Sequence, residues 1–541
     1  MSNLYIPSSL TIDCLEEIIH HLVDHRSSLF SCILVNRLWC KLAIGSLWSR
    51  PFEYHINVKR FSMIIKTYIS CLPIAEKQML RSKNKRILPE IPTEKTSLNI
   101  LDQKKVYSNK DHLLFNYPKY LRILDLSNFQ NGVKQYLTTV TTVNNIEDYQ
   151  LVSFTVQILV NFLIQSTDTL HHLVINSPIM RLFFDITLLP NIDKINQKLS
   201  SISKIDLFLQ RKDAPETYQG YIKLVAHLSK HSRNLNKISI VNDFQDCQPE
   251  ILRHIFKLIE IQNYLEEITI WEFQNPSTFQ WIYTALKTQS HSLKYLGIKR
   301  FRNFSIFLEF LKSCKSLKSL EILDFFVEDG YTPFYIPFNS TISEEIKLEK
   351  FSCCENYSKS SVFSLTMTII IRMANKNLRE LILGDSTDEL IEEIQQNCPN
   401  IIKLSLTLYT TSFEKLLPLL SSSKLEFLYL ESKFDSSALT PNFMQKLAIS
   451  LPKTLLHLGM DLGIVNEGLR LFFEEYGNCG VALYTIELYN YLLDDRVLES
   501  ITKYARKVGG LKKLKISEVN TNISGKGLQE AKDVISSVVL L

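Results

Sequence analysis

A six-residue pattern, apolar-x-x-apolar-x-apolar, recurs along most of the chain. The clearest copies read LRILDL, LKSLEI, LRELIL, LEFLYL and LKKLKI, and from Leu121 to Leu511 thirteen intervals span 390 residues, a mean of 30. A unit this short cannot bury its own apolar side chains and must stack on its neighbours, so a regular array of them predicts a solenoid. Fourteen copies start at Leu121, Leu170, Ile202, Leu235, Leu265, Leu293, Leu317, Leu348, Leu378, Ile401, Leu425, Leu455, Leu483 and Leu511.

The segments between copies have the spacing of amphipathic helices. Apolar residues fall three or four positions apart, which places them on one helical face. Cysteines close two of these faces, and we interpret them as small buried apolar groups rather than nucleophiles or ligands. The two best examples are Phe307, Phe310, Leu311 and Cys314, and Leu390, Ile391, Ile394 and Cys398.

This length and pattern resemble leucine-rich repeats, in which a short strand and a returning helix alternate. The cysteines before Leu317 and Ile401 resemble those of the cysteine-containing class of these repeats. The resemblance implies an α/β fold, a leucine-rich-repeat solenoid or horseshoe, with the strands on its concave side.

The first fifty residues form a separate pattern of three short amphipathic stretches. Cys14, Leu15, Ile18, Ile19 and Leu22 share one helical stripe. Two further stretches contain Leu29, Cys32, Ile33, Val35 and Leu38, then Trp39, Leu42, Ala43, Leu47 and Trp48. A module of this size cannot bury all of these groups, so we expect part of its surface to contact a partner. The alternative is a helical cap for the segment that follows.

This region resembles the F-box, the motif that binds a Skp-family adaptor in cullin-type ubiquitin ligases. F-boxes usually have Leu-Pro where this chain has Leu10-Thr11, and we expect Thr11 to cap the first helix instead. The resemblance implies adaptor contact or F-box integrity for Leu10, Leu15, Ile18, Leu22, Val35, Trp39, Leu47 and Trp48, with Asn36 and Arg37 also in the motif.

The organisation that follows is an F-box over residues 1–52, a partly helical basic connector over 53–118 and about fourteen irregular repeats over 119–541. The connector has 12 Lys/Arg against 6 Asp/Glu, a net +6, whereas residues 119–541 have 45 against 46, a net −1. A neutral array fits a phosphate backbone poorly, so we expect no nucleic-acid ligand. The basic run from Arg81 to Arg86 is either a solvated loop or a nuclear localisation signal.

Strand alternation predicts which side chains of the array face a target. In each copy, the residue between the last two apolar positions and the residue after the last one should point outward. Aromatic and charged residues there are candidates for target binding, and ordinary solvated strand residues are the alternative. The candidates are Trp271, Lys299, Tyr429, Glu431, Asp461, Glu487 and Tyr489. An aromatic stretch over 325–338 breaks the rhythm and is a second candidate.

The remaining sequence favours no catalysis. It contains no Walker loop, no His-Glu-x-x-His and no Gly-x-Ser-x-Gly, and we expect no cofactor and no metal. No run of eighteen apolar residues and no signal peptide is present, so we expect no membrane partner and a cytoplasmic or nuclear location.

The sequence therefore predicts a substrate receptor of an SCF-type ubiquitin ligase. Its partners would be a Skp-family adaptor, a cullin through that adaptor, and a target protein. The combination of F-box and irregular repeats is similar to the expanded receptor families of fungi. The alternative is a repeat scaffold without ligase association, and a more distant one is an enzyme of unrecognised type.

Overall fold

The structure is a computed structural model, and it forms two compact units, Met1–Ile268 and Thr269–Leu541. Each unit is described by itself. The described residues are 11–52, 58–88, 114–141, 147–176, 185–190, 192–209, 219–242, 249–271, 276–299, 304–323, 345–354, 361–409, 412–433, 439–462, 466–489, 493–517 and 522–541.

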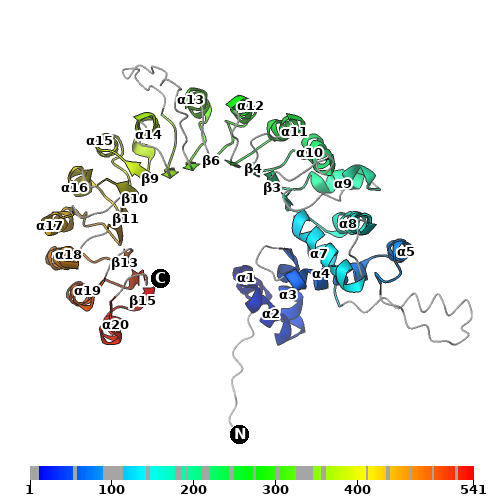
Figure 1. Ribbon diagram of the computed structural model, residues 1–541, viewed down its shortest axis with the longest axis horizontal. Coiled ribbons are helices and arrows are strands. Elements are labelled where there is room, and N and C mark those ends of the chain that lie inside the picture. Colours follow the sequence, from blue (N-terminus) through cyan, green and yellow to red (C-terminus); the bar gives the residue numbers. More distant parts are fainter. Residues whose placement is uncertain are drawn as a thin grey trace, which may run out of the picture. The chain divides into compact units, whose positions relative to one another are not determined.

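The N-terminal unit begins with helices only (Figure 1). Thr11 caps the first helix by accepting the Cys14 amide at 3.4 Å, which confirms the expected cap. Asn36 caps the third by accepting the Trp39 amide at 3.0 Å. The helices are α1 (Ile12–His21), α2 (Arg26–Val35), α3 (Arg37–Trp48), α4 (Val58–Cys71) and α5 (Ile74–Lys83).

Helix α4 packs into the start of the repeat array. Phe61, Ile65, Tyr68 and Ile69 on this helix are buried, and so is Leu72 directly after it. The contact with the first array helix, α7 (Leu126–Val140), is close, because a Cβ on Gly132 would stand 3.1 Å from both Ile65 and Phe61. Helix α4, in the first half of the connector over residues 53–118, thus shares one core with the first repeat.

The rest of the N-terminal unit alternates strands and helices. Strands β1 to β4 are parallel, each paired with the next in sequence. The elements are η1 (Tyr117–Tyr120), β1 (Ile123–Asp125), α7, α8 (Glu147–Ser166), β2 (His172–Asn176), η2 (Ile186–Leu188), α9 (Ile192–Leu199), β3 (Lys204–Leu209), α10 (Gln219–His231), β4 (Lys237–Asn242), α11 (Pro249–Glu260) and β5 (Glu267–Trp271), within which the division between units falls.

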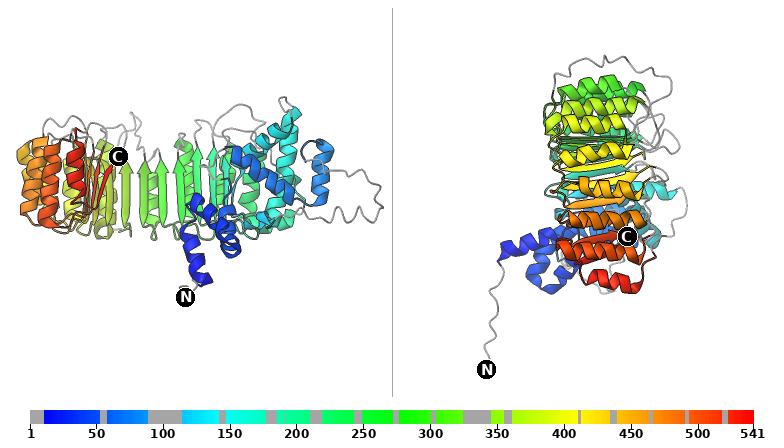
Figure 2. Two further views of the ribbon diagram at one scale, coloured as in Figure 1. Left: turned by 90° about the horizontal axis from the view of Figure 1, so that it is seen from below. Right: turned by 90° about the vertical axis from the view of Figure 1, so that its left-hand side faces the viewer.

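The C-terminal unit continues the same alternation, with helices on the outside of its curve and strands on the inside (Figure 1). Its strands lie side by side and point the same way (Figure 2). The elements are α12 (Pro276–Lys287), β6 (Tyr295–Lys299), α13 (Phe304–Ser313), β7 (Ser319–Leu323), β8 (Lys350–Cys354), α14 (Ser361–Ala374), η4 (Asn375–Asn377), β9 (Glu380–Ser386), α15 (Asp388–Asn397), β10 (Lys403–Leu408), α16 (Phe413–Ser422), β11 (Phe427–Ser432), α17 (Pro441–Ser450), β12 (His457–Asp461), α18 (Asn466–Asn478), β13 (Thr485–Leu488), α19 (Asp495–Val508), β14 (Lys513–Ile516), α20 (Gly525–Lys532) and β15 (Ser537–Leu540).

The predicted repeats are confirmed one by one. Strands β1 to β14 each begin two residues after one of the fourteen predicted starting residues, and every starting residue is buried. The mixed α/β repeat and the parallel strands are those of a leucine-rich-repeat solenoid. Strand β15 is a fifteenth copy that the sequence analysis missed, although Ile535, Val538 and Leu540 repeat the pattern.

At most junctions between neighbouring repeats, one backbone carbonyl just before a strand accepts two amides from the next repeat. The Arg122 carbonyl accepts the amides of His171 and His172, at 2.9 and 3.1 Å, and the Tyr484 carbonyl likewise accepts Lys512 and Lys513, at 3.0 and 3.1 Å. Each such pair fixes the register of one repeat on the next, because a carbonyl that accepts two successive amides sets where the following strand begins.

For the first repeat, the three-helix module provides the carbonyl that accepts the two amides before the strand. The Ser49 carbonyl accepts the amides of Arg122 and Ile123, at 2.8 and 2.9 Å. Phe52 packs edge-on against Phe129 with ring centroids 5.2 Å apart. The end of α3 thus takes the place of a preceding repeat.

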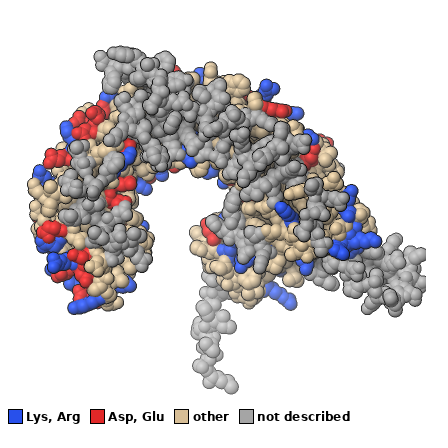
Figure 3. All heavy atoms as spheres, viewed as in Figure 1, with Lys and Arg blue, Asp and Glu red and all other residues tan. Residues whose placement is uncertain are grey.

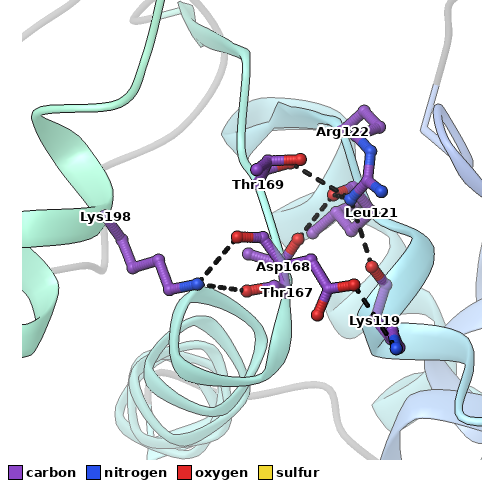
Figure 4. Close-up of polar contacts among 7 residues, drawn as sticks. All are labelled: Lys119, Leu121, Arg122, Thr167, Asp168, Thr169 and Lys198. Carbon is purple, nitrogen blue, oxygen red and sulfur yellow. Dashed lines mark hydrogen bonds and ion pairs between the residues drawn. The ribbon is translucent and has the colours of Figure 1, made fainter.

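A cluster of charged side chains ties the turns before β1 and β2 together (Figure 4). The Arg122 guanidinium donates to the carbonyls of Lys119 and Thr169, at 3.2 and 3.3 Å. Lys198 donates to the Thr167 and Asp168 carbonyls, at 2.7 and 2.8 Å. The Thr167, Asp168 and Thr169 carbonyls follow the C-terminus of α8, where the helix dipole favours a cation.

Asp125 yields a testable pH dependence. It is buried and caps α7 by accepting the Asn128 amide at 2.9 Å. Burial raises its pKa from 3.8 to about 6, although bonds from Asn128 and Ser127 and the nearby His172 oppose the shift. A raised pKa means that the native state binds the proton more tightly, so this contribution is full below pH 3.8 and is lost as the pH rises through 6. The loss is roughly 3 kcal/mol for about 2 pKa units.

We expect Asp125→Asn, which keeps a capping oxygen, to melt higher than the unmodified chain at pH 8 and to lose this advantage at pH 5. Thermal melting at the two pH values measures it. The exposed Asp193→Asn is the control and should show no such difference. Equal melting shifts for Asp125→Asn at both pH values would contradict the assignment.

Candidate functional site

The structure separates the predicted F-box residues into interior and surface. Leu15 is buried, and Leu22, Trp39 and Leu47 are half-buried. The last three pack against a core formed by Ile19, Leu29, Cys32 and Ala43. Leu10 lies outside the described residues. This interior group contributes to the integrity of the module.

Trp48 has a role that the sequence analysis did not separate from adaptor contact. Its ring lies 4.4 Å from the Tyr117 ring and 5.6 Å, edge-on, from Tyr68. Tyr68 is on α4 and Tyr117 begins η1. Trp48 therefore connects the three-helix module to the start of the array.

Ile18 and Val35 are on the surface, among other exposed apolar side chains. Val35 is 59% exposed and Leu34 is 71% exposed. Phe30 lies one helical turn before Leu34 on α2, so these two side chains share one face of that helix. Val35 ends α2, and Leu38 follows in the first turn of α3. We define the docking face as Phe30, Leu34, Val35 and Leu38.

Sequence reasoning assigned no contact to Phe30, and it placed Leu38 in a helical stripe. The available signal was the Phe30 and Leu34 spacing of four, which lies off the stripe of Leu29 and Cys32.

Two arginines hold this part of the module in place. Arg26 donates to the Leu47 and Arg50 carbonyls, at 3.2 and 2.8 Å. Arg50 donates to Asp24 at 2.7 Å, and this lowers the pKa of Asp24.

The C-terminal candidates for target binding are brought together on three adjacent strands. Tyr429 and Glu431 of β11 pair in register with Gly459 and Asp461 of β12. Glu487 of β13 pairs with Gly459 from the other side. The rings of Tyr429 and Tyr489 meet edge to face at 6.1 Å. We call Tyr429, Glu431, Asp461, Glu487 and Tyr489 the tyrosine cluster.

All members of the tyrosine cluster are half-buried rather than fully exposed. Gly459, which strand alternation predicted to be exposed, is buried beneath Tyr429, and a Cβ on it would meet that ring. Gly297 is similarly buried, next to the hydroxyl of Tyr295. The prediction failed at both glycines because a neighbouring tyrosine fills the space that their missing side chains leave.

The cluster is less acidic than its sequence indicates. Lys515 on β14, which the sequence analysis did not include, bonds to Glu487, and Tyr489 donates to the same carboxylate at 2.8 Å. Burial acts to raise the pKa of Glu487, but these two bonds outweigh it and the pKa is lowered. Thr407 donates to Glu431 at 2.9 Å.

Burial, with the nearby carboxylates, raises the pKa of both tyrosines, that of Tyr489 to about 12. Both hydroxyls therefore stay protonated at neutral pH. Each is a hydrogen-bond donor on an aromatic ring, not a nucleophile. The cluster is suited to contact a partner.

Trp271 and Lys299 form a separate pair. The Lys299 ammonium lies 5.8 Å from the centroid of the Trp271 ring, a cation–π contact between β5 and β6. Four strands lie between β6 and β11, so the two are five strand spacings apart, roughly 24 Å. These two residues therefore do not join the tyrosine cluster. The aromatic stretch over 325–338 lies outside the described residues.

The buried cysteines behave as apolar groups. Cys314 and Cys398 are buried, and burial raises the pKa of each to about 12. Within the described ranges, no three His, Cys, Asp or Glu side chains are grouped to hold a metal ion. No helix in those ranges combines the length and apolar character needed to cross a membrane.

No protein-family model and no curated protein matches this sequence. Among solved structures, it is similar to the leucine-rich repeat-containing protein LegL7 from Legionella pneumophila, with 12% identity over 62% of this chain and 90% of that one, and a TM-score of 0.34. A Bacteroides fragilis protein shows 14% identity over 63% and 74%, with a TM-score of 0.24. Both scores are low, so the repeat assignment rests on the strands and helices of this chain.

Trp48→Ala should destabilise the N-terminal unit by about 3 kcal/mol, the low end for a tryptophan truncation because the ring is half-buried. Hydrogen exchange should show faster exchange in α3 and α4 and unchanged exchange in β11 to β13. Trp281→Ala is the matched control, since Trp281 is 53% exposed on α12. Equal effects of the two substitutions would contradict the connecting role of Trp48.

Proposed function

We propose that this chain is the substrate-recognition subunit of an SCF-type ubiquitin ligase, with α1 to α3 acting as an F-box that binds a Skp-family adaptor. The docking face is the observation that supports this proposal. Six of the nineteen large apolar side chains exposed in the described residues lie between Ile12 and Leu38, about a twentieth of the chain. Such a concentration is typical of an interaction surface.

The physical case for a partner is the cost of leaving this face in water. Covering an apolar side chain of this size stabilises an interface by roughly 1.5 to 3 kcal/mol. Four of them on one surface provide an apolar centre of the kind that dominates binding energy. The interior positions, including Trp39 and Leu47, hold the backbone that presents this face.

The link to the array supports a role in positioning. The bonds from Arg122 and Ile123 to the Ser49 carbonyl and the contacts of Trp48 fix the module on the first repeat. In a ligase, a receptor of this type contributes proximity and orientation. In this proposal, other subunits reached through a cullin perform ubiquitin transfer, and this chain is not an enzyme.

For the target, we propose that the tyrosine cluster binds a protein segment bearing Lys or Arg. Tyr429 and Tyr489 offer aromatic surface, and Glu431 and Asp461 offer negative charge beside it. A cation beside an aromatic ring and a carboxylate gains from both. The location would be the cytoplasm or nucleus, where such ligases work.

The second candidate is a repeat scaffold without ligase association. The same repeats and the same tyrosine cluster favour it, because they require only a protein partner. Adaptor binding distinguishes the two proposals.

The full chain should co-purify with a co-expressed Skp-family adaptor. The double substitution Leu34→Asp and Val35→Asp should weaken the complex by about 100-fold, because it places two charges at the centre of an apolar interface. Titration calorimetry measures the affinity. Ile449→Asp, at a site 62% exposed on α17, is the matched control and should bind normally.

A folded chain that does not bind the adaptor would move the scaffold to first place. A complex that the double substitution leaves unchanged would show that the docking face is wrongly placed. Trp48→Ala is unsuitable for this test, because loss of its contacts with Tyr68 and Tyr117 would disturb the module itself.

Tyr429→Ala with Tyr489→Ala should reduce capture of the target by about tenfold or more and leave adaptor binding intact. Quantitative mass spectrometry of proteins captured by each form measures this. Tyr149→Ala, 43% exposed on α8, is the control. If every captured protein is recovered equally with the double substitution, the cluster is not the target site.

A further inference from the structure

A second aromatic surface lies at the start of strands β11 to β13, separate from the tyrosine cluster. Phe427 and His457 are the first residues of β11 and β12 and pair in register. Leu456 and Tyr484 precede β12 and β13 and are 44% and 52% exposed. We call Phe427, Leu456, His457 and Tyr484 the rim patch.

The rim patch is continuous. The Phe427 and His457 rings are 5.9 Å apart, and His457 and Tyr484 are 6.0 Å apart, edge to face. The Tyr484 amide donates to the Leu456 carbonyl at 2.7 Å, which fixes these two exposed residues side by side on adjacent repeats. The backbone of the stack thus holds the patch in place before any partner arrives.

Lysines stand at both ends of this patch. The Lys403 ammonium lies 4.7 Å from the centroid of the Phe427 ring at one end. At the other end, the Lys512 amide donates to the Tyr484 carbonyl at 3.0 Å, and Lys513 pairs in register with Thr485. Lys424 and Lys453 are also exposed just before β11 and β12, against one carboxylate, that of the exposed Glu426.

The surroundings of the rim patch are therefore mainly basic, whereas the tyrosine cluster contains carboxylates. Along β11 and β12, Phe427 and His457 stand at the first position, next to the lysines, and Glu431 and Asp461 at the fifth. Four strand residues span roughly 13 Å, which is beyond the Debye length in physiological salt. A ligand at the start of β11 and β12 is thus screened from Glu431 and Asp461. Glu487, at the third position of β13, lies nearer, and Lys513 contributes to lowering its pKa.

We infer that the rim patch is a second recognition site, which takes an acidic polypeptide segment with an apolar side chain at its centre. The apolar residue packs on Leu456 and Tyr484, and the flanking carboxylates pair with Lys403 on one side and with Lys512 and Lys513 on the other. An apolar centre with a charged rim is the arrangement that carries binding energy in protein interfaces. This inference does not depend on adaptor binding.

A single-stranded nucleic acid is the competing occupant, because it also uses rings and lysines. It requires ring faces open for stacking and positive charge along its path. The centre of the rim patch instead contains aliphatic Leu456 and an edge-to-face pair, and its lysines lie at the ends. These features favour a peptide.

The test uses the full chain and an array of short synthetic peptides. The peptides combine a Leu-Phe or a Ser-Ser centre with flanks of Asp and Glu, of Lys and Arg, or of Ser. Binding should concentrate on acidic peptides with the apolar centre. Fluorescence anisotropy of the best such peptide should show a loss of about tenfold or more with Leu456→Ala and Tyr484→Ala together, and a similar loss with Lys512→Glu and Lys513→Glu.

The controls are at exposed sites on helices of the same unit. Ile449→Ala matches the apolar substitutions, and Lys526→Glu with Lys532→Glu matches the charge reversals. Tyr429→Ala with Tyr489→Ala should leave acidic-peptide binding unchanged, which separates this site from the proposed target site. Adaptor binding should be unaffected in all of these forms.

Four outcomes would overturn the inference. The first is the absence of any acidic, apolar-centred peptide among the binders, and the second is equal binding by the patch variants and their controls. The third is an oligonucleotide of mixed sequence that binds more tightly than the best peptide and loses binding with the same substitutions. Dimerisation of the chain that the patch substitutions abolish would likewise assign this surface to a second copy.

Discussion

The arrangement of each unit depends on backbone carbonyls that, at most junctions, accept two successive amides from the next repeat. These bonds fix where the strands begin, and strand alternation then decides which side chains enter the core and which face outward. A shift of one residue would exchange the buried leucines for the charged positions between them. The side-chain surfaces described above are consequences of that register, since neighbours such as Tyr429, Gly459 and Glu487 meet only through it.

The sequence was sufficient to locate the strands because the buried positions are a local and repeated requirement. Leu121 and Leu511 each lie two residues before a strand although 390 residues separate them. Ile535 lies at the same place before β15, although the sequence analysis did not include it. The candidate surfaces were less accessible. The half-burial of Tyr429 depends on Gly459 in the next repeat. The charge of Glu487 is balanced by Lys515, which also lies one repeat further along the chain. Such effects depend on tertiary neighbours that the spacing of one copy does not reveal.

The module at the start of the chain shows the same limit. Its amphipathic stretches indicated three helices, and these are present. Periodicity alone could not separate Trp48, which packs on α4 and η1, from Val35, which faces solvent, because both are large apolar residues in helices. Both signs of charge are visible on the surface of the C-terminal unit (Figure 3). The near-zero net charge of the array likewise does not reveal that lysines lie just before β11 and β12 while Glu431 and Asp461 lie near the ends of the same strands.

The Ser49 carbonyl gives the three-helix module a second duty besides any partner that it binds. It terminates a stack that would otherwise present the amides of Arg122 and Ile123 and the side chain of Phe129 to water. An array cut free at its first strand would therefore expose a sticky strand edge and tend to self-associate. Any module that replaced this one would therefore have to offer a carbonyl at the same point to close the array.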